Sequence, residues 1–112
     1  MITLSQLAGS TEPMQFSIAA IDAEGNPYNP ASDPVAVAFP AVTSPPVPFD
    51  AGAATWHPAS WAIAAGPVYW VTILVGPANG GVALAAGSYV AMVRITDNPA
   101  VPVEPAAYVN IT

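Results

Sequence analysis

Prolines and glycines recur at short intervals along the whole chain, and this spacing limits the possible folds more than any other feature. The 112 residues include 14 prolines and 8 glycines, and no segment between them has the length and amphipathic period of a globular helix. Proline breaks the interior of a helix, whereas turns and strand ends tolerate it. The sequence therefore predicts an all-β chain.

Seven segments have the residue types and the alternation of short β-strands. They are residues 2–7, 14–22, 35–39, 54–61, 68–75, 88–96 and 107–112. Seven short strands with turn signals between them, in a chain of the size of one domain, are typical of an antiparallel sandwich. We therefore predict a single immunoglobulin-like β-sandwich domain over residues 1–112.

Apolar residues alternate along three of these segments, which predicts the faces that are buried. The rows expected in the core are Met14, Phe16, Ile18 and Ala20; Tyr69, Val71, Ile73 and Val75; and Tyr89, Ala91, Val93 and Ile95. The opposite rows are Trp70, Thr72 and Leu74, and Val90, Met92, Arg94 and Thr96. These rows are too apolar for a solvated sheet face, so we expect something to cover them.

Charge is scarce in this chain and limits its possible partners. Charged residues make up 7% of the sequence, hydrophobic residues make up 54%, and the net charge is -6. A single Lys or Arg cannot neutralise several phosphates, which argues against nucleic acid and against an anionic membrane surface. The absence of cysteine excludes disulfides and thiolate metal sites. Such a surface favours contact with other proteins.

The most apolar stretch, residues 61–77, resembles a membrane span only in its hydropathy. Gly66-Pro67 and Gly76-Pro77 interrupt it, and they leave about nine residues where a spanning helix needs about 20. We therefore expect a buried strand and no membrane contact. The N-terminal stretch has no basic region followed by an apolar one, so no secretory signal is predicted.

Two groups of residues are candidates for chemical sites. The only histidine, His57, lies between two tryptophans and has no zinc partners or nucleophile elbow at usable spacing, so stacking on aromatic rings explains it better than catalysis. Oxygen ligands that are candidates for calcium lie between residues 22 and 33. They are Asp22, Glu24, Asn26, Asn29 and Asp33, and their spacing departs from the EF-hand pattern, so a solvated turn is the simpler interpretation.

Two loop segments have more ordinary explanations than ligand binding. Residues 76–81 (GPANGG) lack the lysine and the following helix of a phosphate loop, and a hairpin turn is predicted instead. Residues 44–48 (SPPVP) have polyproline character, and we interpret them as a stiff crossover between sheets rather than as a ligand for an aromatic groove. We therefore predict no cofactor and no catalytic residue.

The segment LAAGSY carries a more specific structural signal. Leu84, Gly87 and Tyr89 stand at the entry to a predicted strand. This pattern is typical of the tyrosine corner of immunoglobulin-like sandwiches, in which the tyrosine hydroxyl bonds to backbone a few residues upstream. We predict that role for Tyr89.

Several segments together resemble a known group of proteins. These are DPVAVAFP (33–40), AATWHPASW (53–61), VTILVGP (71–77) and the C-terminal LAAGSYVAMVRITDNPAVPVEPAAYVNIT (84–112). They resemble small immunoglobulin-like virion structural proteins of tailed bacteriophages, particularly those infecting actinobacteria. The turn DAEGNP (22–27) and the late G-x-Y-x-x-x-V-R-I pattern are also similar in plan to the N-terminal domain of phage baseplate upper proteins.

The resemblance implies a virion building block that is not an enzyme and that assembles in the cytoplasm of a bacterial host. Capsid decoration, as a minor capsid protein, is the leading expectation. The alternative is a head-to-tail connector or a tail or baseplate component, with glycan or host binding as a further option. The expected partners are major capsid or head-tail proteins and further copies of the chain. The aromatic and Met candidates for these interfaces, with core packing as the competing role, are Trp56, Trp61, Trp70, Tyr28 and Met92.

Arg94 is the only Lys or Arg of the chain and lies within a predicted strand. By parity it shares a face with Val90, Met92 and Thr96 and should point away from the core. One hypothesis gives it a carboxylate of a neighbouring subunit as partner; a solvated side chain or a carboxylate of the same sheet is the alternative. Under the first hypothesis, Arg94→Ala leaves folding nearly intact and weakens assembly.

Overall fold

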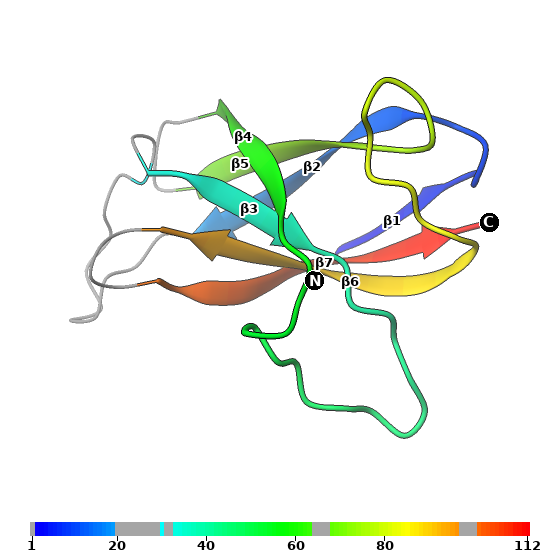
Figure 1. The fold of residues 1–112 in the computed structure, drawn as a ribbon. Helices are drawn as coiled ribbons and strands as arrows, with labels where there is room; N and C mark the ends of the chain where they lie inside the picture. The colour runs from blue at the N-terminus through cyan, green and yellow to red at the C-terminus, as the bar shows by residue number, and fades with distance from the viewer. Residues whose placement is uncertain (1, 20–29, 31–32, 64–67, 97–100) are drawn as a thin grey trace.

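The structure is a computed structural model that describes residues 2–19, 30, 33–63, 68–96 and 101–112. Its strands are β1 (Ile2–Gln6), β2 (Glu12–Ala19), β3 (Val35–Ala38), β4 (His57–Ile63), β5 (Val68–Val75), β6 (Gly87–Ile95) and β7 (Val103–Ile111) (Figure 1). The described residues contain no helix. The predicted all-β fold is therefore confirmed.

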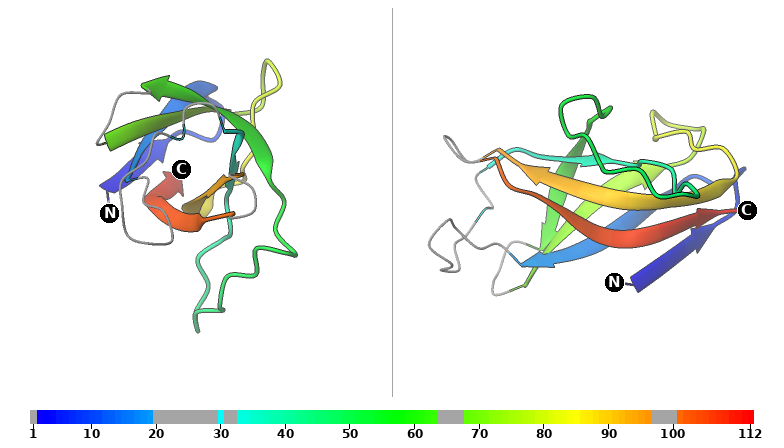
Figure 2. Two further views of the ribbon diagram at one scale, coloured as in Figure 1. Left: turned by 90° about the vertical axis from the view of Figure 1, so that its left-hand side faces the viewer. Right: turned by 90° about the horizontal axis from the view of Figure 1, so that it is seen from below.

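The seven strands form one mixed sheet that curls around the core. Its strand order is β1-β7-β6-β3-β4-β5-β2. The strand β4 bends from one layer to the other, because its first residues pair with β3 and its last residues pair with β5. The far strands also approach each other, since β2 contacts β7, and the end view in Figure 2 shows the strands surrounding the interior. The architecture is nearly that of a barrel.

The prediction of a purely antiparallel sandwich is wrong at the first strand. The strand β1 runs parallel to β7, with Ile2 opposite Ala107 and Gln6 opposite Ile111. The end of β1 is tied to the other layer by the buried Gln6, whose Nε2 donates hydrogen bonds to the carbonyls of Val75 (2.8 Å) and Ser10 (2.9 Å). Both donors of this buried amide therefore have backbone acceptors.

The core consists of the inward rows of the strands. The rows expected from the alternating pattern are buried on β2, β5 and β6, except that Tyr89 is only half-buried and Ala20 lies outside the described residues. Further core side chains come from β3 and β7: Val35, Val37, Ala106, Ala107, Val109 and Ile111. The period of two therefore identified the buried face correctly wherever the structure describes it.

Two strands begin three or four residues from the predicted position, and proline accounts for one of these differences. The strand β7 begins at Val103, four residues before the predicted start at residue 107, and contains Pro105. The pairing of β6 with β7 shifts between Ala91 and Met92, which leaves Ala106 as an extra residue beside Pro105. A bulge tolerates proline within a ladder. On the other side of the barrel, β4 begins at His57 and not at residue 54.

The glycine-rich turn of residues 76–81 does not join paired strands, so the predicted hairpin is wrong. The strand β5 pairs with β2 and β4, whereas β6 pairs with β3 and β7. The turn itself is tight: Gly81 N–H donates to the Ala78 carbonyl at 3.0 Å, and Asn79 (φ 55°) and Gly80 (φ 77°) occupy the left-handed region between them. Positive φ at both central residues is typical of a type I′ turn.

Candidate functional site

The long connection between β3 and β4 is the most unusual element of the fold, and we call residues 40–56 the strap loop. Its first residues continue alongside β6 where β3 has ended. The Val90 N–H donates to the Pro40 carbonyl at 3.0 Å, and the Val42 N–H donates to the Ser88 carbonyl at 2.9 Å. The loop then runs out beyond the β6 surface and returns to β4 (Figure 1). Its beginning is therefore fixed to β6 by backbone pairing.

This path corrects the interpretation of residues 44–48. The strap loop joins β3 to β4, and these strands pair with each other, so the proline-rich segment is not a crossover between separate sheets. It lies instead over the outer face of its own sheet, where Pro46, Val47 and Pro48 line a pocket. Proline suits this path because each ring removes a backbone donor that the loop would otherwise have to satisfy.

The strap loop covers part of the outer row of β6, as the apolar character of that row led us to expect. Along β6 the inward residues are buried and the outward residues Val90, Met92 and Arg94 are half-buried. Ala38, which lies opposite Met92, is only 1% exposed. The cover is thus provided by the same chain, and it is incomplete.

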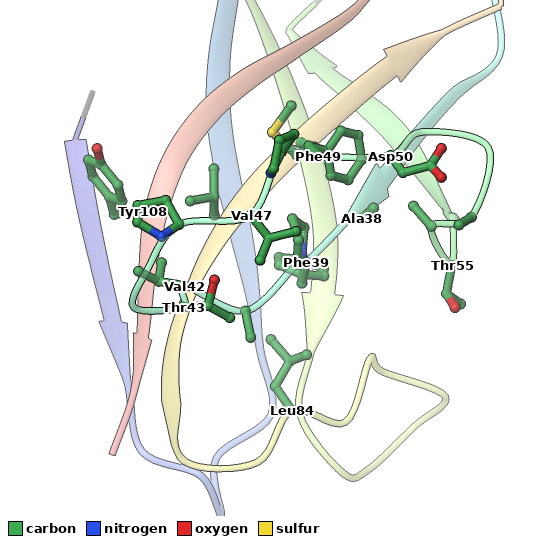
Figure 3. A pocket seen from close by; sticks show the side chains of 18 of the residues that line it. Ala38, Phe39, Val42, Thr43, Val47, Phe49, Asp50, Thr55, Leu84 and Tyr108 are labelled. Atoms are coloured by element: carbon green, nitrogen blue, oxygen red, sulfur yellow. The ribbon is translucent and has the colours of Figure 1, made fainter.

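An apolar pocket of about 720 Å³ remains between the strap loop and the sheet (Figure 3). Its floor comes from β3, β6 and β7, and its walls come from the strap loop. The principal apolar side chains are Phe39, Val42, Val47, Phe49, Leu84, Val90, Met92 and Tyr108. This volume lies within the range of about 300–1,000 Å³ that is usual for ligand sites. The pocket is therefore the best candidate for a binding site among the described residues.

The polar groups of the pocket are few and lie mainly on the strap loop. They are Thr43, Asp50, Thr55, His57 and Tyr108. The Asp50 carboxylate lies at the margin beside Phe49 (Figure 3), and its Oδ1 accepts a hydrogen bond from the Gly52 N–H at 3.0 Å. The only Lys or Arg of the chain, Arg94, does not line the pocket. A carboxylate or phosphate ligand would thus find no Lys or Arg here.

Arg94 lies next to this pocket and contacts the end of the strap loop. Its guanidinium carbon is 4.6 Å from the centre of the Trp56 ring. Trp56 also makes an edge contact with Phe49, with ring centres 5.9 Å apart, and its Nε1 donates to the Ala51 carbonyl at 3.0 Å. A cation over an indole face is attractive by about 0.5–1 kcal/mol at an exposed site. Arg94 therefore helps to hold the loop against β6.

The contact with Trp56 is a third interaction of Arg94, beside the two hypotheses drawn from the sequence. Its outward direction is confirmed, because it alternates with the buried Val93 and Ile95. Neither sequence hypothesis foresaw the contact with Trp56 within the same chain. The Arg94 Nε is buried and has no hydrogen-bond partner among the described residues. Leaving such a donor unpaired is unfavourable by about 1–3 kcal/mol.

The predicted interface residues do not form one patch. Met92 lines the pocket and Trp56 is adjacent to it, whereas Trp61 packs against the core from β4, with its ring centre 6.2 Å from that of Tyr69. Trp61 Nε1 donates to the Asp33 carbonyl at 3.0 Å. Trp70 is half-buried on β5, opposite Ser17 of β2. Tyr28 lies outside the described residues.

The other candidates from the sequence are only partly described. The proposed calcium ligands Asp22, Glu24, Asn26 and Asn29 lie outside the described residues, and Asp33 alone is described. No group of three or more potential metal ligands occurs in the described part of the chain. His57 is half-buried, and its ring lies 6.4 Å from that of Phe39, which agrees with the aromatic contact expected for it.

Tyr89 makes the hydrogen bond that a tyrosine corner requires. Its hydroxyl donates to the Ala85 carbonyl at 2.7 Å, four residues upstream. Leu84 packs against the core and Gly87 precedes Tyr89 with φ +155°. The bond fixes the entry of β6, on which the pocket floor depends.

One carboxyl group has a shifted pKa. Glu104 lies opposite Val93 in the β6–β7 pairing and is partly buried. Burial raises the pKa of Glu104, because removing the charged carboxylate from water is unfavourable.

Sequence reasoning missed much of the pocket wall. Phe39, Val47, Phe49 and Tyr108 were not singled out, although all four line the pocket. The available signal was in the connection FPAVTSPPVPF, which holds aromatic and β-branched residues between prolines where a solvated loop would hold polar ones. Large apolar residues in a loop indicate that the loop packs against something.

No family model, curated protein or solved structure matches this chain in the comparisons made. Within the described residues, none of the secondary structure is a helix long and apolar enough to cross a membrane. The function must therefore be inferred from the strap loop, the pocket, the composition and the resemblance of the sequence.

Proposed function

We propose that this chain is a non-enzymatic structural protein of a tailed-bacteriophage virion, where it decorates the capsid and is held by contacts with neighbouring proteins. The sequence resemblance supplies the phage setting. The composition supports permanent contact with protein, because protein interfaces are depleted in charged residues and only 7% of this chain is charged.

The strand pairing supports the finer assignment of an immunoglobulin-like fold. With the strands lettered A to G in chain order, such domains place A, B, E and D in one sheet and C, F and G in the other. The β2–β5–β4 pairing corresponds to B–E–D, and the β3–β6–β7 pairing corresponds to C–F–G. The Tyr89 hydroxyl bond at the start of β6 fits the tyrosine corner of strand F. The departures are β1, which pairs with β7, and the added pairing of β3 with β4.

The observation that carries the proposal is the apolar surface of the strap loop and the pocket beneath it. Val42 and Val47 of the loop are exposed, Val47 to 73%, and Tyr108 on the adjacent β7 is 45% exposed. Exposed apolar groups around an apolar pocket are typical of contact sites. The residues that line the pocket include no pair of carboxylates and no set of metal ligands, so its chemistry supports binding rather than a reaction.

The alternative of a glycan-binding tail or baseplate module has less support. It relied on Trp56 and Trp61 as exposed stacking platforms. Trp56 already contacts Arg94 and Phe49, and Trp61 already packs against Tyr69. A sugar ring would have to displace one of these neighbours before it could stack on either indole.

Fractionation of phage particles from the source culture tests the proposal. Particles are banded on a density gradient, and the chain is quantified against the major capsid protein by mass spectrometry. We expect the chain to band with intact particles and with tail-less heads at a fixed ratio. Recovery of the chain only in the particle-free fractions would overturn the virion role, and recovery with isolated tails alone would overturn capsid decoration.

A further inference from the structure

The charge around the pocket restricts its occupant. The ionisable groups that line it are Asp50, His57 and Tyr108, and the chain as a whole has a net charge of -6. An anionic partner would be repelled over a distance of about 10 Å at moderate salt. A partner with positive charge near its contact residue would be attracted to the margin where Asp50 lies.

A second copy of this chain is poorly suited to supply that positive charge. Arg94 is its only Lys or Arg, and the Arg94 guanidinium is stacked on Trp56. Two copies approaching through this surface would also bring two net-negative molecules together. The occupant favoured by charge is therefore a segment of a different protein.

We propose that the pocket receives a large apolar side chain from an extended segment of another protein, and that a lysine or arginine next to that side chain meets Asp50. This inference rests on the proposed docking function and names the partner chemistry. The apolar side chain enters between Val47 of the strap loop and Met92 of β6, where removal of apolar surface from water supplies the binding energy. The basic residue stays at the solvated margin, where it contributes to selection and to the rate of association.

The pocket geometry is consistent with this division of roles. Figure 3 shows Phe39 and Val47 in the middle of the pocket, whereas Asp50 lies at one side of it. The Asp50 carboxylate is exposed, and its only hydrogen-bond partner among the described residues is the Gly52 N–H. One Asp50 oxygen is therefore available to a cationic side chain.

Titration of the ¹⁵N-labelled full chain with short blocked peptides tests the inference by NMR. The probes are the tetrapeptides Gly-Trp-Lys-Gly, Gly-Trp-Glu-Gly and Gly-Ala-Lys-Gly. We expect the Trp-Lys peptide to shift the amides of Val47, Phe49 and Met92 and to bind about threefold more tightly than the Trp-Glu peptide. The Ala-Lys peptide should leave these amides unshifted. Shifts confined to another face, or equal responses to the three peptides, would overturn the inference.

Two variants and a matched control separate the charge from the apolar anchor. Asp50→Asn should abolish the preference for Trp-Lys over Trp-Glu while both peptides still shift Met92. Val47→Lys, at a position that is 73% exposed, should reverse the preference. Glu12→Gln removes the same charge from the exposed start of β2 and should change nothing. An unchanged preference in Asp50→Asn would contradict the assigned role of that carboxylate.

Sedimentation equilibrium distinguishes a second copy from a different protein as occupant. We expect a monomer whose mass does not depend on concentration in the parent and in Val47→Lys. A dimer that Val47→Lys disrupts would show that a second copy fills the pocket, and would overturn the inference. If the peptides do not bind but the chain is present on banded particles, only this inference is refuted. If the chain is absent from the particles, the proposed function is refuted.

Discussion

The two faces of β6 belong to the same nine residues and are covered in different ways. The inward row, Ala91, Val93 and Ile95, is buried by side chains of neighbouring strands, and Val93 is 0% exposed. The outward row, Val90, Met92 and Arg94, is covered by an irregular loop that is attached through a few backbone bonds and one stacking contact. Neighbouring strands pack closely against the inward face of β6, whereas the strap loop leaves a pocket on the outward face.

This difference separates stability from binding within one strand. Close packing makes every methylene of the inward row contribute to folding, because a vacated volume there stays empty. The outward row borders space that is already open, so changes there should alter the surface more than the fold. The predictions below test this division, beginning with the largest expected effect.

The direct test is a matched pair of alanine substitutions at adjacent positions of β6. Val93→Ala should lower the free energy of unfolding by about 2–3 kcal/mol, since it creates a cavity in the core. Met92→Ala removes a larger side chain but should lower it by only about 0.5–1 kcal/mol, since Met92 borders the pocket. Urea denaturation measures both values. A loss for Met92→Ala equal to that for Val93→Ala would contradict the division.

Tyr89 stands at the start of the inward row and tests whether a polar bond contributes there. Tyr89→Phe removes the donor to the Ala85 carbonyl and should lower the free energy of unfolding by about 0.5–1.5 kcal/mol. Tyr108→Phe is the control, because the Tyr108 side chain is exposed and removal of its hydroxyl should have almost no effect. Equal unfolding midpoints for Tyr89→Phe and the parent would argue against the corner.

Arg94 tests the attachment of the strap loop. Arg94→Met keeps the apolar stem, removes the cation over Trp56 and also removes the unpaired Nε, so stability should change by less than about 1 kcal/mol. The loop should nevertheless open more often. Hydrogen exchange of the Trp56 indole N–H, which is bonded to Ala51, should become faster, while that of the Trp61 indole N–H stays unchanged. Unchanged exchange of the Trp56 indole N–H would contradict a role of Arg94 in holding the strap loop against β6.

Glu104 is expected to give the smallest effect and depends on pH. Its pKa is raised in the folded chain, so the folded state retains a proton that the unfolded state loses as the pH rises. The charged form of Glu104 therefore destabilises the fold at neutral pH, and this destabilisation disappears below the ordinary pKa of glutamate, about 4.3. Glu104→Gln should raise the melting temperature by about 1–3 °C at pH 7 and by less at pH 4. The effect is small because Glu104 is partly exposed and solvent screens its charge. A gain that does not depend on pH would contradict the burial effect.

The sequence was sufficient for the strands and for the inward faces, because the alternation at Met14, Phe16 and Ile18 and at Val71, Ile73 and Val75 reflects the local geometry of a strand. It also predicted the outward direction of Arg94 and the hydrogen bond of Tyr89 to upstream backbone. These features depend on residues close together in the chain, so a period or a short motif contains them.

The rest depended on long-range pairing that no local pattern encodes. The parallel pairing of Ile2 with Ala107 spans almost the whole chain, and the strap loop meets β6 through residues far apart in sequence, such as Val42 and Ser88. The cation of Arg94 was noticed, but its neighbour Trp56 was assigned to a surface role. The candidate site was therefore identified only in part, through Met92, which lines the pocket, and through Arg94 and Trp56, which lie next to it.

The parallel alignment of β1 and β7 also has a mechanical consequence. A force that draws residues 2 and 111 apart pulls β1 toward its beginning and β7 toward its end, which are opposite directions along two parallel strands. The load therefore acts in shear on all hydrogen bonds of this pair together. Two antiparallel terminal strands would instead be peeled apart one bond at a time. The β1–β7 pair should therefore resist tension between residues 2 and 111 better than an antiparallel pair of the same length would.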